Sequence, residues 1–261
     1  MAYEQKISRE KPGLIGLIVD DSGSMSDSLP GTSDPKFLWV ARYFGIILLE
    51  LLARSTEMKG NDAVVKPRYY LTVVKYGSHP ELWGSPEMDI ETAVGLFTEG
   101  GNSLGLGGHL CGTDSEAAFA EMLVHLKNSL ASERFKNSFP PMIFHLSDGE
   151  SATDATALAH EAMQQSTTDG QTLVVNAYIG TQTNLGYNGP EDFSGYIDVT
   201  EAGSSEDNIR LFEMSSEVPA SIEANLKEDG IFPQLRSGSR LFFDVRTKDM
   251  LKRGLQVVGS L

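Results

Sequence analysis

Continuous apolar runs and amphipathic stretches, separated by polar turns, organise the first half of the chain. Residues 13–20 (GLIGLIVD) are apolar up to the final aspartate, which is typical of a strand buried on both faces of a parallel sheet. At 35–54 the apolar positions recur at helical spacing, and Pro35 suits a first helical turn. Residues 68–77 are rich in β-formers and predict a second strand. A polar, proline-containing stretch then leads to a short amphipathic segment at 90–97.

The second half repeats this alternation. A glycine-rich loop at 99–114 (EGGNSLGLGGHLCGTD) opens a helical pattern that continues through Leu126. Residues 141–150 (PMIFHLSDGE) repeat the arrangement of the first strand, because an apolar run again delivers an aspartate followed by glycine. The remaining predicted elements are helices at 154–165, 208–216, 221–228 and 247–258 and strands at 173–180 and 240–245.

Strands that alternate with helices predict an α/β fold with a doubly wound, mostly parallel central sheet. Ligands of such folds bind outside the carboxyl ends of the strands. The length of 261 residues fits one α/β domain with elaborated loops. We predict an N-terminal tail (1–12) and one domain (13–261), with a polar insertion at about 181–207 in which 196–199 is a candidate short strand.

Charge and cysteine content narrow the classes of partner. The chain has 36 acidic and 21 basic residues and a formal net charge of −15, which repels nucleic acids and anionic membrane surfaces. The single cysteine, Cys111, cannot form an internal disulfide, and no apolar run has the length of a membrane span. The N-terminal residues show no apolar signal-peptide core. We therefore expect a cytoplasmic protein that binds neither nucleic acid nor membrane.

Oxygen-bearing side chains cluster at three places that this architecture brings together. They follow the first strand, precede the helix after the glycine-rich loop, and follow the strand near residue 146. Mg²⁺ or Mn²⁺ takes about six oxygen ligands, so two carboxylates and three hydroxyls leave one position for an outside ligand. The predicted metal ligands are Asp20, Ser22, Ser24, Thr113 and Asp148.

Two of these clusters resemble a known family. The sequence DDSGSM at 20–25 resembles the DxSxS element of von Willebrand factor A (VWA) domains, and HLSDGE at 145–150 resembles their later Asp-Gly loop. The resemblance implies a non-enzymatic binding module with a metal-ion-dependent adhesion site (MIDAS), in which an Asp or Glu of a protein partner completes the metal shell. It also implies that Ser22 and Ser24 bind the ion directly, and that Thr113 does so directly or through water. By the same resemblance, Asp20 and Asp148 act mainly through water.

The third element departs from the family pattern, which is often a compact Gly-Gly-Thr-Asn sequence. We favour Thr113 because it directly precedes the helix, and Ser103 is the competing candidate. Thr113 also has an alternative interpretation as a plain helix N-cap, with Asp114 as the rival cap. Asp21 is unusual within the DxSxS element, where it either tightens cation binding or lies in solvent.

The C-terminal third resembles the tail of bacterial cytoplasmic VWA proteins of the tellurite-resistance type. Such proteins often occur alongside PP2C-like phosphatases and serine/threonine kinases. The resemblance implies an intracellular scaffold or regulator that acts with signalling enzymes in a stress-response or defence system.

The sequence leaves two alternative functions open. One is a metal-assisted phosphoryl or ester hydrolase, which would need a base and a nucleophile or second metal that the sequence does not display. The other is a structural subunit of an assembly with an AAA+ ATPase. The five histidines lack zinc-site spacing, and His145 lies in an apolar strand, where we expect a hydrogen-bonded core residue.

Overall fold

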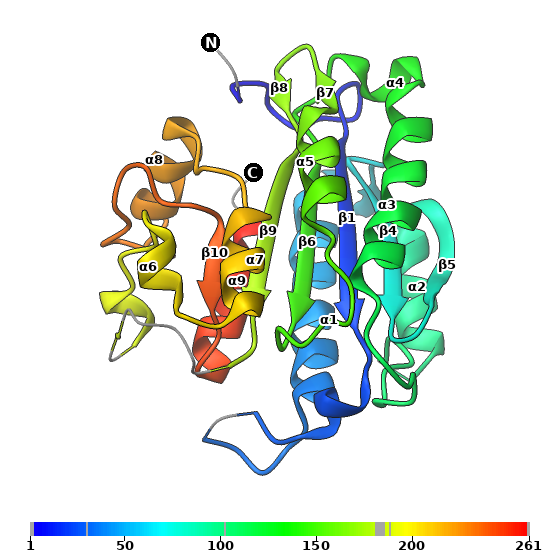
Figure 1. The fold of residues 1–261 in the computed structure, drawn as a ribbon. Helices are drawn as coiled ribbons and strands as arrows, with labels where there is room; N and C mark the ends of the chain where they lie inside the picture. The colour runs from blue at the N-terminus through cyan, green and yellow to red at the C-terminus, as the bar shows by residue number, and fades with distance from the viewer. Residues whose placement is uncertain (1–2, 30, 102, 181–185, 188, 260–261) are drawn as a thin grey trace.

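A six-stranded sheet forms the centre of the molecule (Figure 1). The computed structural model describes residues 3–29, 31–101, 103–180, 186–187 and 189–259. The strands are, in spatial order, β10 (Phe242–Asp244), β9 (Leu173–Tyr178), β6 (Met142–Ser147), β1 (Gly13–Asp20), β4 (Tyr69–Tyr76) and β5 (Pro80–Asp89). Neighbouring strands pair in parallel except for β5, which pairs antiparallel with β4. The predicted doubly wound, mostly parallel α/β class is confirmed.

Helices cover both faces of this sheet. Alternate residues of β1 point to opposite sides: Leu17 packs with one apolar cluster and Ile18 with the other. The first cluster includes residues of α1 (Lys36–Ser55), α2 (Ile90–Glu99), α8 (Ala220–Glu228) and α9 (Lys248–Gly259). The second includes residues of α3 (Ser115–Leu130) and α5 (Thr156–Gln164), which cover the opposite face in Figure 1. The shorter elements are η1 (Gly23–Ser26), β2 (Thr56–Lys59), β3 (Asp62–Val65), α4 (Glu133–Lys136), β7 (Ser166–Thr167), β8 (Gly170–Gln171), η2 (Pro190–Asp192), α6 (Val199–Ala202) and α7 (Glu206–Glu213).

The polar stretch before residue 90 is a strand, which corrects the interpretation from sequence. β5 is an edge strand whose residues are mostly part-exposed or exposed, so it lacks the apolar run of a central strand. It contains Pro80 and Pro86, and proline is tolerated in sheets chiefly at edges because it cannot donate to the ladder. The β2–β3 hairpin was also missed by the sequence analysis. Five of its eight residues are exposed and the other three are only part-buried.

The described part of the segment 181–207 packs against the core. Residues 181–185 and 188 lie outside the described residues. Phe193 and Tyr196 are fully buried, and the Phe193 ring contacts Phe232 and Phe243. The candidate strand at 196–199 is wrong: Tyr196 forms only an isolated bridge with Arg240, and Val199 begins a helix.

Membrane-spanning capacity can be judged from the helices themselves. Within the described ranges, none of them combines the length and apolar character that crossing a bilayer requires.

Candidate metal centre

Asp20 lies fully buried at the carboxyl end of β1 and joins two loops. Its Oδ1 accepts a hydrogen bond of 2.8 Å from the backbone N–H of Ser22. Its Oδ2 accepts one of 3.0 Å from the hydroxyl of Ser147, the last residue of β6. Both carboxylate oxygens are therefore already bonded within the chain, which suits the indirect role that the family resemblance implies for this residue.

The two serines of the DxSxS element present a pair of hydroxyl groups. Ser22 Oγ and Ser24 Oγ lie 3.1 Å apart. Ser22 stands at the N-cap position of η1, but its side chain makes no capping hydrogen bond. The turn is thus an Asx turn formed by Asp20, and the serine hydroxyls are not used as helix caps.

Asp148 comes directly after β6 and is only half satisfied. Its side chain is 5% exposed. Its Oδ2 forms an ion pair of 3.0 Å with the Lys36 ammonium, whereas its Oδ1 is buried without a hydrogen-bond partner among the described residues. An unpaired buried acceptor costs about 1–3 kcal/mol, and more when it is charged. A carboxylate oxygen in this state is suited to bind a cation or a cation-bound water.

Lys36 is a residue of this centre that sequence reasoning missed. Its Nζ donates to the backbone oxygen of Ser24 at 3.2 Å as well as to Asp148, and its side chain is 13% exposed. Lys36 is the first residue of α1, where the helix dipole disfavours a positive charge. A lysine at this unfavourable position was the one sign in the sequence that Lys36 has a charged partner. The partner could not be identified, because Asp148 lies 112 residues away in sequence.

The loop before α3 contacts both of the other loops. Leu110 forms a bridge with Ser22, and the Thr113 backbone oxygen accepts a 2.9 Å hydrogen bond from the N–H of Ala152. Thr113 is therefore held between the DxSxS turn and the loop that follows Asp148.

Three residues of the loop before α3 have different hydrogen-bond roles. Asp114 is the N-cap of α3, because its side chain accepts from Ala117 N at 3.0 Å, so Thr113 is not the cap. The Ser103 hydroxyl accepts from the N–H of Gly105 within its own turn. These contacts favour Thr113 over Ser103 as the contribution of this loop.

Asp21 does not lie in solvent. It is 2% exposed, and its Oδ1 accepts hydrogen bonds of 2.8 Å from the N–H groups of both Gly107 and Gly108. Gly108 has a φ of +64°, and a Cβ there would meet Ser26 Oγ at 2.1 Å, so glycine is required for this close approach. Asp21 anchors the glycine-rich loop against the DxSxS turn.

Burial and neighbouring charge perturb the Asp20 carboxyl. Burial raises the pKa of Asp20 to about 6, hydrogen bonds from Ser22 and Ser147 oppose the rise, and the charge of Asp148 adds to it. Two carboxylates in a poorly solvated site therefore favour a nearby positive charge. Lys36 supplies one such charge.

A buried hydrogen-bond chain supports the strands behind this centre. The ring nitrogens of His145 bond Tyr76 Oη and Asn176 Oδ1, each at 2.8 Å, and Asn176 Nδ2 donates to Ser215 Oγ at 3.0 Å. Burial lowers the pKa of His145 to about 4, so the ring is neutral at pH 7 and bonds as one donor and one acceptor. The expectation of a hydrogen-bonded core histidine is confirmed.

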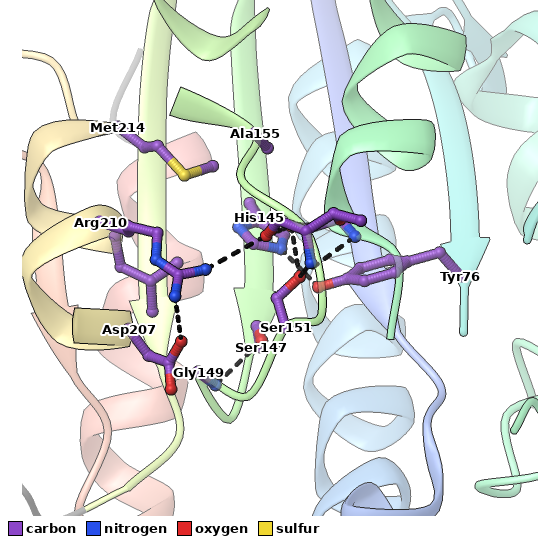
Figure 2. A pocket seen from close by; sticks show the side chains of 12 residues that line it. Tyr76, His145, Ser147, Gly149, Ser151, Ala155, Asp207, Arg210 and Met214 are labelled. Carbon is purple, nitrogen blue, oxygen red and sulfur yellow. Dashed lines mark hydrogen bonds and ion pairs between the residues drawn. The ribbon is translucent and has the colours of Figure 1, made fainter. Parts of the chain in front are cut away.

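A small cavity lies between the Tyr76–His145 hydrogen bond and the loop that contains Asp148. Figure 2 shows Tyr76, His145, Ser151 and Arg210 around it. Its volume of about 20 Å³ leaves room for a single water molecule. The Ser151 hydroxyl lies 2.7 Å from that of Ser115, which ties the Asp148 loop to the start of α3.

The chemistry of the donor set fits a hard cation. All five predicted ligands offer oxygen, and Asp148 Oδ1 is an unpaired acceptor among them. In the described part of the chain, no group of three or more His, Cys, Asp or Glu residues could hold a metal. The residues present therefore suit Mg²⁺ or Mn²⁺ bound by hydroxyls, carboxylates and water better than a cysteine–histidine zinc site.

Comparisons with known proteins bear on the fold. No protein-family model matches the sequence, and no curated protein sequence matches it. Proximal thread matrix protein 1 from the mussel byssus aligns over 98% of this chain and 47% of its own, with 9% identity and a TM-score of 0.50. An aerotolerance-related membrane protein from Bacteroides fragilis aligns over 77% of this chain and 86% of its own, with 13% identity and a TM-score of 0.46. The manganese-loaded TRAP protein of Plasmodium vivax aligns over 66% of this chain and 58% of its own, with 17% identity and a TM-score of 0.39.

The alignment with the mussel protein supports a shared VWA-type fold, as the motifs implied. The chain spans less than half the length of that protein. The same mussel protein is also described with a zinc-occupied MIDAS motif. The narrower resemblance to the tellurite-resistance type stays a hypothesis.

Proposed function

We propose that this chain is a metal-dependent protein–protein interaction module. Mg²⁺, or Mn²⁺ in its place, binds at the carboxyl end of the sheet, where a bound divalent cation supplies a strongly directional site for an anionic oxygen. The protein partner offers an Asp or Glu to that site. The residues that would hold the ion are Asp20, Ser22, Ser24, Thr113 and Asp148.

One observation carries this proposal. Asp148 Oδ1 is buried and has no hydrogen-bond partner in the described structure, and the Lys36 ammonium joins the other oxygen of this carboxylate to the backbone of Ser24 in the DxSxS turn. A purely structural turn would pair such an oxygen with a backbone N–H or a hydroxyl. Its isolation is understandable when a hydrated cation is its normal partner.

The charge of the protein favours a short-range mode of recognition. At −15 the molecule repels an acidic partner, and at moderate ionic strength salt screens this repulsion only beyond about 10 Å. Attraction of a carboxylate must therefore come from a direct contact with the ion. The surrounding loops, including exposed His109 and Cys111, then supply specificity at the rim.

We further propose an intracellular scaffold or regulator in a bacterial stress-response or defence system. A PP2C-like phosphatase or a serine/threonine kinase would be the partner, as in the proteins whose C-terminal sequence this chain resembles. The module itself has no catalytic activity under this proposal, because the cavity beside Asp148 has room for about one water and both ring nitrogens of His145 in its wall are already bonded, to Tyr76 and Asn176.

The metal prediction is tested by titration calorimetry with Mg²⁺, Mn²⁺ and Zn²⁺, zinc being included because of the mussel protein. We expect one site for Mg²⁺ or Mn²⁺, abolished in Asp20→Ala and Ser22→Ala and unchanged in Ser33→Ala, whose exposed hydroxyl lies outside the centre. Unchanged binding in the first two variants would refute the assignment.

The partner prediction is tested by affinity capture with wild-type and Thr113→Ala protein, after circular dichroism has shown that both are folded. Capture should survive moderate salt, fail with EDTA and weaken in the variant. If both proteins capture the same partners equally and EDTA has no effect, the ion is structural and the interaction surface lies elsewhere. Phosphatase assays complete the test: metal-dependent turnover that disappears in Asp148→Ala would support the hydrolase alternative.

A further inference from the structure

A second concave site lies at the amino ends of the strands, away from the metal centre. It is an open pocket of about 570 Å³, which lies within the usual range of small-molecule sites. Its walls come from the N-terminal segment 3–7, the end of α1, the start of β4 and the first turns of α8. The eight residues of β1 separate it from the Asp20 turn by roughly 20 Å.

The charge of this pocket is opposite to that of the protein. Lys6, Arg54 and Arg68 line it, and Glu4 is the acidic residue among its lining side chains. Together with Glu4 and with Glu57, which pairs with Arg68, the three basic groups leave a formal local charge of +1 in a chain of net charge −15. Lys6 and Arg54 are exposed and form no ion pair with another described residue, so their charges are available to a ligand.

Two polar groups of the pocket lack partners within the described structure. The Arg68 guanidinium is held by the Arg54 backbone oxygen at 2.8 Å and by the Glu57 carboxylate, yet its Nε is buried without an acceptor. Ser221 Oγ, in the first turn of α8, is likewise buried and unpaired. Because both atoms are buried, an anion in the open pocket meets the exposed part of the Arg68 side chain, which Glu57 and the Arg54 backbone hold in place.

The remaining lining is aromatic and apolar. Tyr69 and Phe139 are buried residues of the wall, Tyr3 packs edge-on against Phe139 with ring centroids 6.2 Å apart, and Ile222 adds an aliphatic side chain. Rings that already pack against one another form a preorganised apolar surface. Such a surface suits a flat, apolar ligand body more than a bare inorganic ion.

We propose that this pocket binds a small anionic molecule, with its carboxylate or phosphate group at Arg54 and Arg68 and a planar apolar body against Tyr69 and Phe139. The site is independent of the metal centre and of the function proposed above. The acidic partner group expected at the metal would thus be matched by a second anion site at the other end of the sheet.

The test is titration of the full chain, by calorimetry and saturation-transfer NMR, with four probes: phenyl phosphate, benzoate, neutral benzamide and inorganic phosphate. The variants are Arg54→Gln and Arg68→Gln, checked for folding by circular dichroism. The matched control is Arg9→Gln, which removes the same charge from an exposed position of the N-terminal segment outside the pocket. All titrations are repeated with EDTA and with Asp20→Ala.

We expect one saturable site for phenyl phosphate or benzoate, at least tenfold tighter than for benzamide and for inorganic phosphate. The affinity should fall at least tenfold in Arg54→Gln, which is exposed and should fold normally, and in Arg68→Gln. It should not change in Arg9→Gln, in Asp20→Ala or with EDTA. The stronger of the two aromatic anions identifies the headgroup as phosphate or carboxylate.

Several outcomes would overturn the proposal. They are the absence of saturable binding by either aromatic anion, equal binding of benzamide, and equal loss in Arg9→Gln and Arg54→Gln. Equal affinity for inorganic phosphate would overturn the role given to the aromatic wall. Loss of binding in Asp20→Ala would place the anion at the metal centre instead. Because none of these results depends on metal binding by wild-type protein, failure here is distinct from failure of the MIDAS function.

Discussion

Replacement of Lys36 by methionine should have opposite effects on metal affinity and on metal-free stability. In the structure the Lys36 ammonium occupies one side of Asp148, 3.0 Å from Oδ2, and thereby neutralises one of the two carboxylates of the centre. Methionine keeps much of the apolar stem but removes the charge. In this variant no ammonium competes with the metal for Asp148 or repels the metal.

The size of the effect follows from the geometry. Two unit charges 3.0 Å apart attract by about 5 to 6 kcal/mol at an effective dielectric constant of about 20. Desolvation of the ammonium offsets much of this attraction, and Lys36, being 13% exposed, can move toward solvent when an ion binds. We therefore expect a gain in metal binding of about 1.5 to 3 kcal/mol, or roughly ten- to a hundredfold in Kd.

Metal-free stability should change in the other direction. Without Lys36, the largely buried Asp148 carboxylate has no charge partner, and removal of one partner of a buried pair typically destabilises a protein by about 3–5 kcal/mol. We expect a loss nearer 2 kcal/mol, since Asp148 keeps slight exposure and can hydrate. Saturating Mg²⁺ should restore most of this loss.

The assay is calorimetric titration with Mg²⁺ and Mn²⁺, together with urea unfolding in EDTA and in saturating metal. Lys127→Met is the matched control, because Lys127 makes an exposed ion pair with Glu161 and its removal changes the net charge equally. Lys36→Arg should retain weak metal binding. Unchanged or weaker metal binding in Lys36→Met would refute the competition and show that Lys36 instead holds Asp148 in position for the ion.

Two further predictions concern residues around the centre. Burial lowers the pKa of His145 from 6.5 to about 4, so the unfolded chain binds the proton at a higher pH than the folded chain does. As the pH falls from 6.5 to about 4, His145 should therefore lower the free energy of unfolding by about 3 kcal/mol. Asp20, with a raised pKa of about 6, changes the stability in the opposite direction over the same pH range. The readout is therefore the difference in urea-unfolding free energy between wild type and His145→Asn, measured as a function of pH. A difference that does not depend on pH would contradict the argument. Asp21→Ala should cost about 2 to 3 kcal/mol, because two charge-assisted hydrogen bonds to the glycine-rich loop are lost, and should weaken metal binding severalfold. Urea unfolding and calorimetry check this, with the exposed Asp27→Ala as control; equal values for the two variants would show that the loop does not depend on Asp21.

The central part of the fold was predictable because burial on both faces leaves a clear record in sequence. The strands at 13–20, 142–147 and 173–178 have every residue buried, so their apolar runs could be recognised without knowledge of their neighbours. The edge strand β5 has the reverse property. One side of an edge strand lacks a neighbour and its faces are partly wet, so its composition resembles that of a loop.

The candidate centre was predictable for the residues at the carboxyl ends of buried strands. Parallel strands bring their carboxyl ends to one edge, which is why Asp20 and Asp148 could be placed together from their positions alone. The roles of Asp21 and Lys36 could not be read in this way. The role of Asp21 comes from hydrogen bonds to backbone N–H groups 86 and 87 residues away, and that of Lys36 from an ion pair with a carboxylate 112 residues away. Both roles therefore depend on how distant loops meet.

Lys36 also bears on how a strongly acidic protein can attract a carboxylate. Without metal, Asp20, Asp148 and Lys36 together carry a formal charge of −1. Under the proposed function a divalent cation changes this local charge to +1, and the change from repulsion to attraction depends on the lysine as well as on the ion. Lys36 thus weakens metal binding, but it makes the metal-bound centre more positive and so strengthens its attraction for the partner's carboxylate. In Lys36→Met the metal-bound centre would be neutral, so tighter metal binding should accompany weaker capture of an acidic partner.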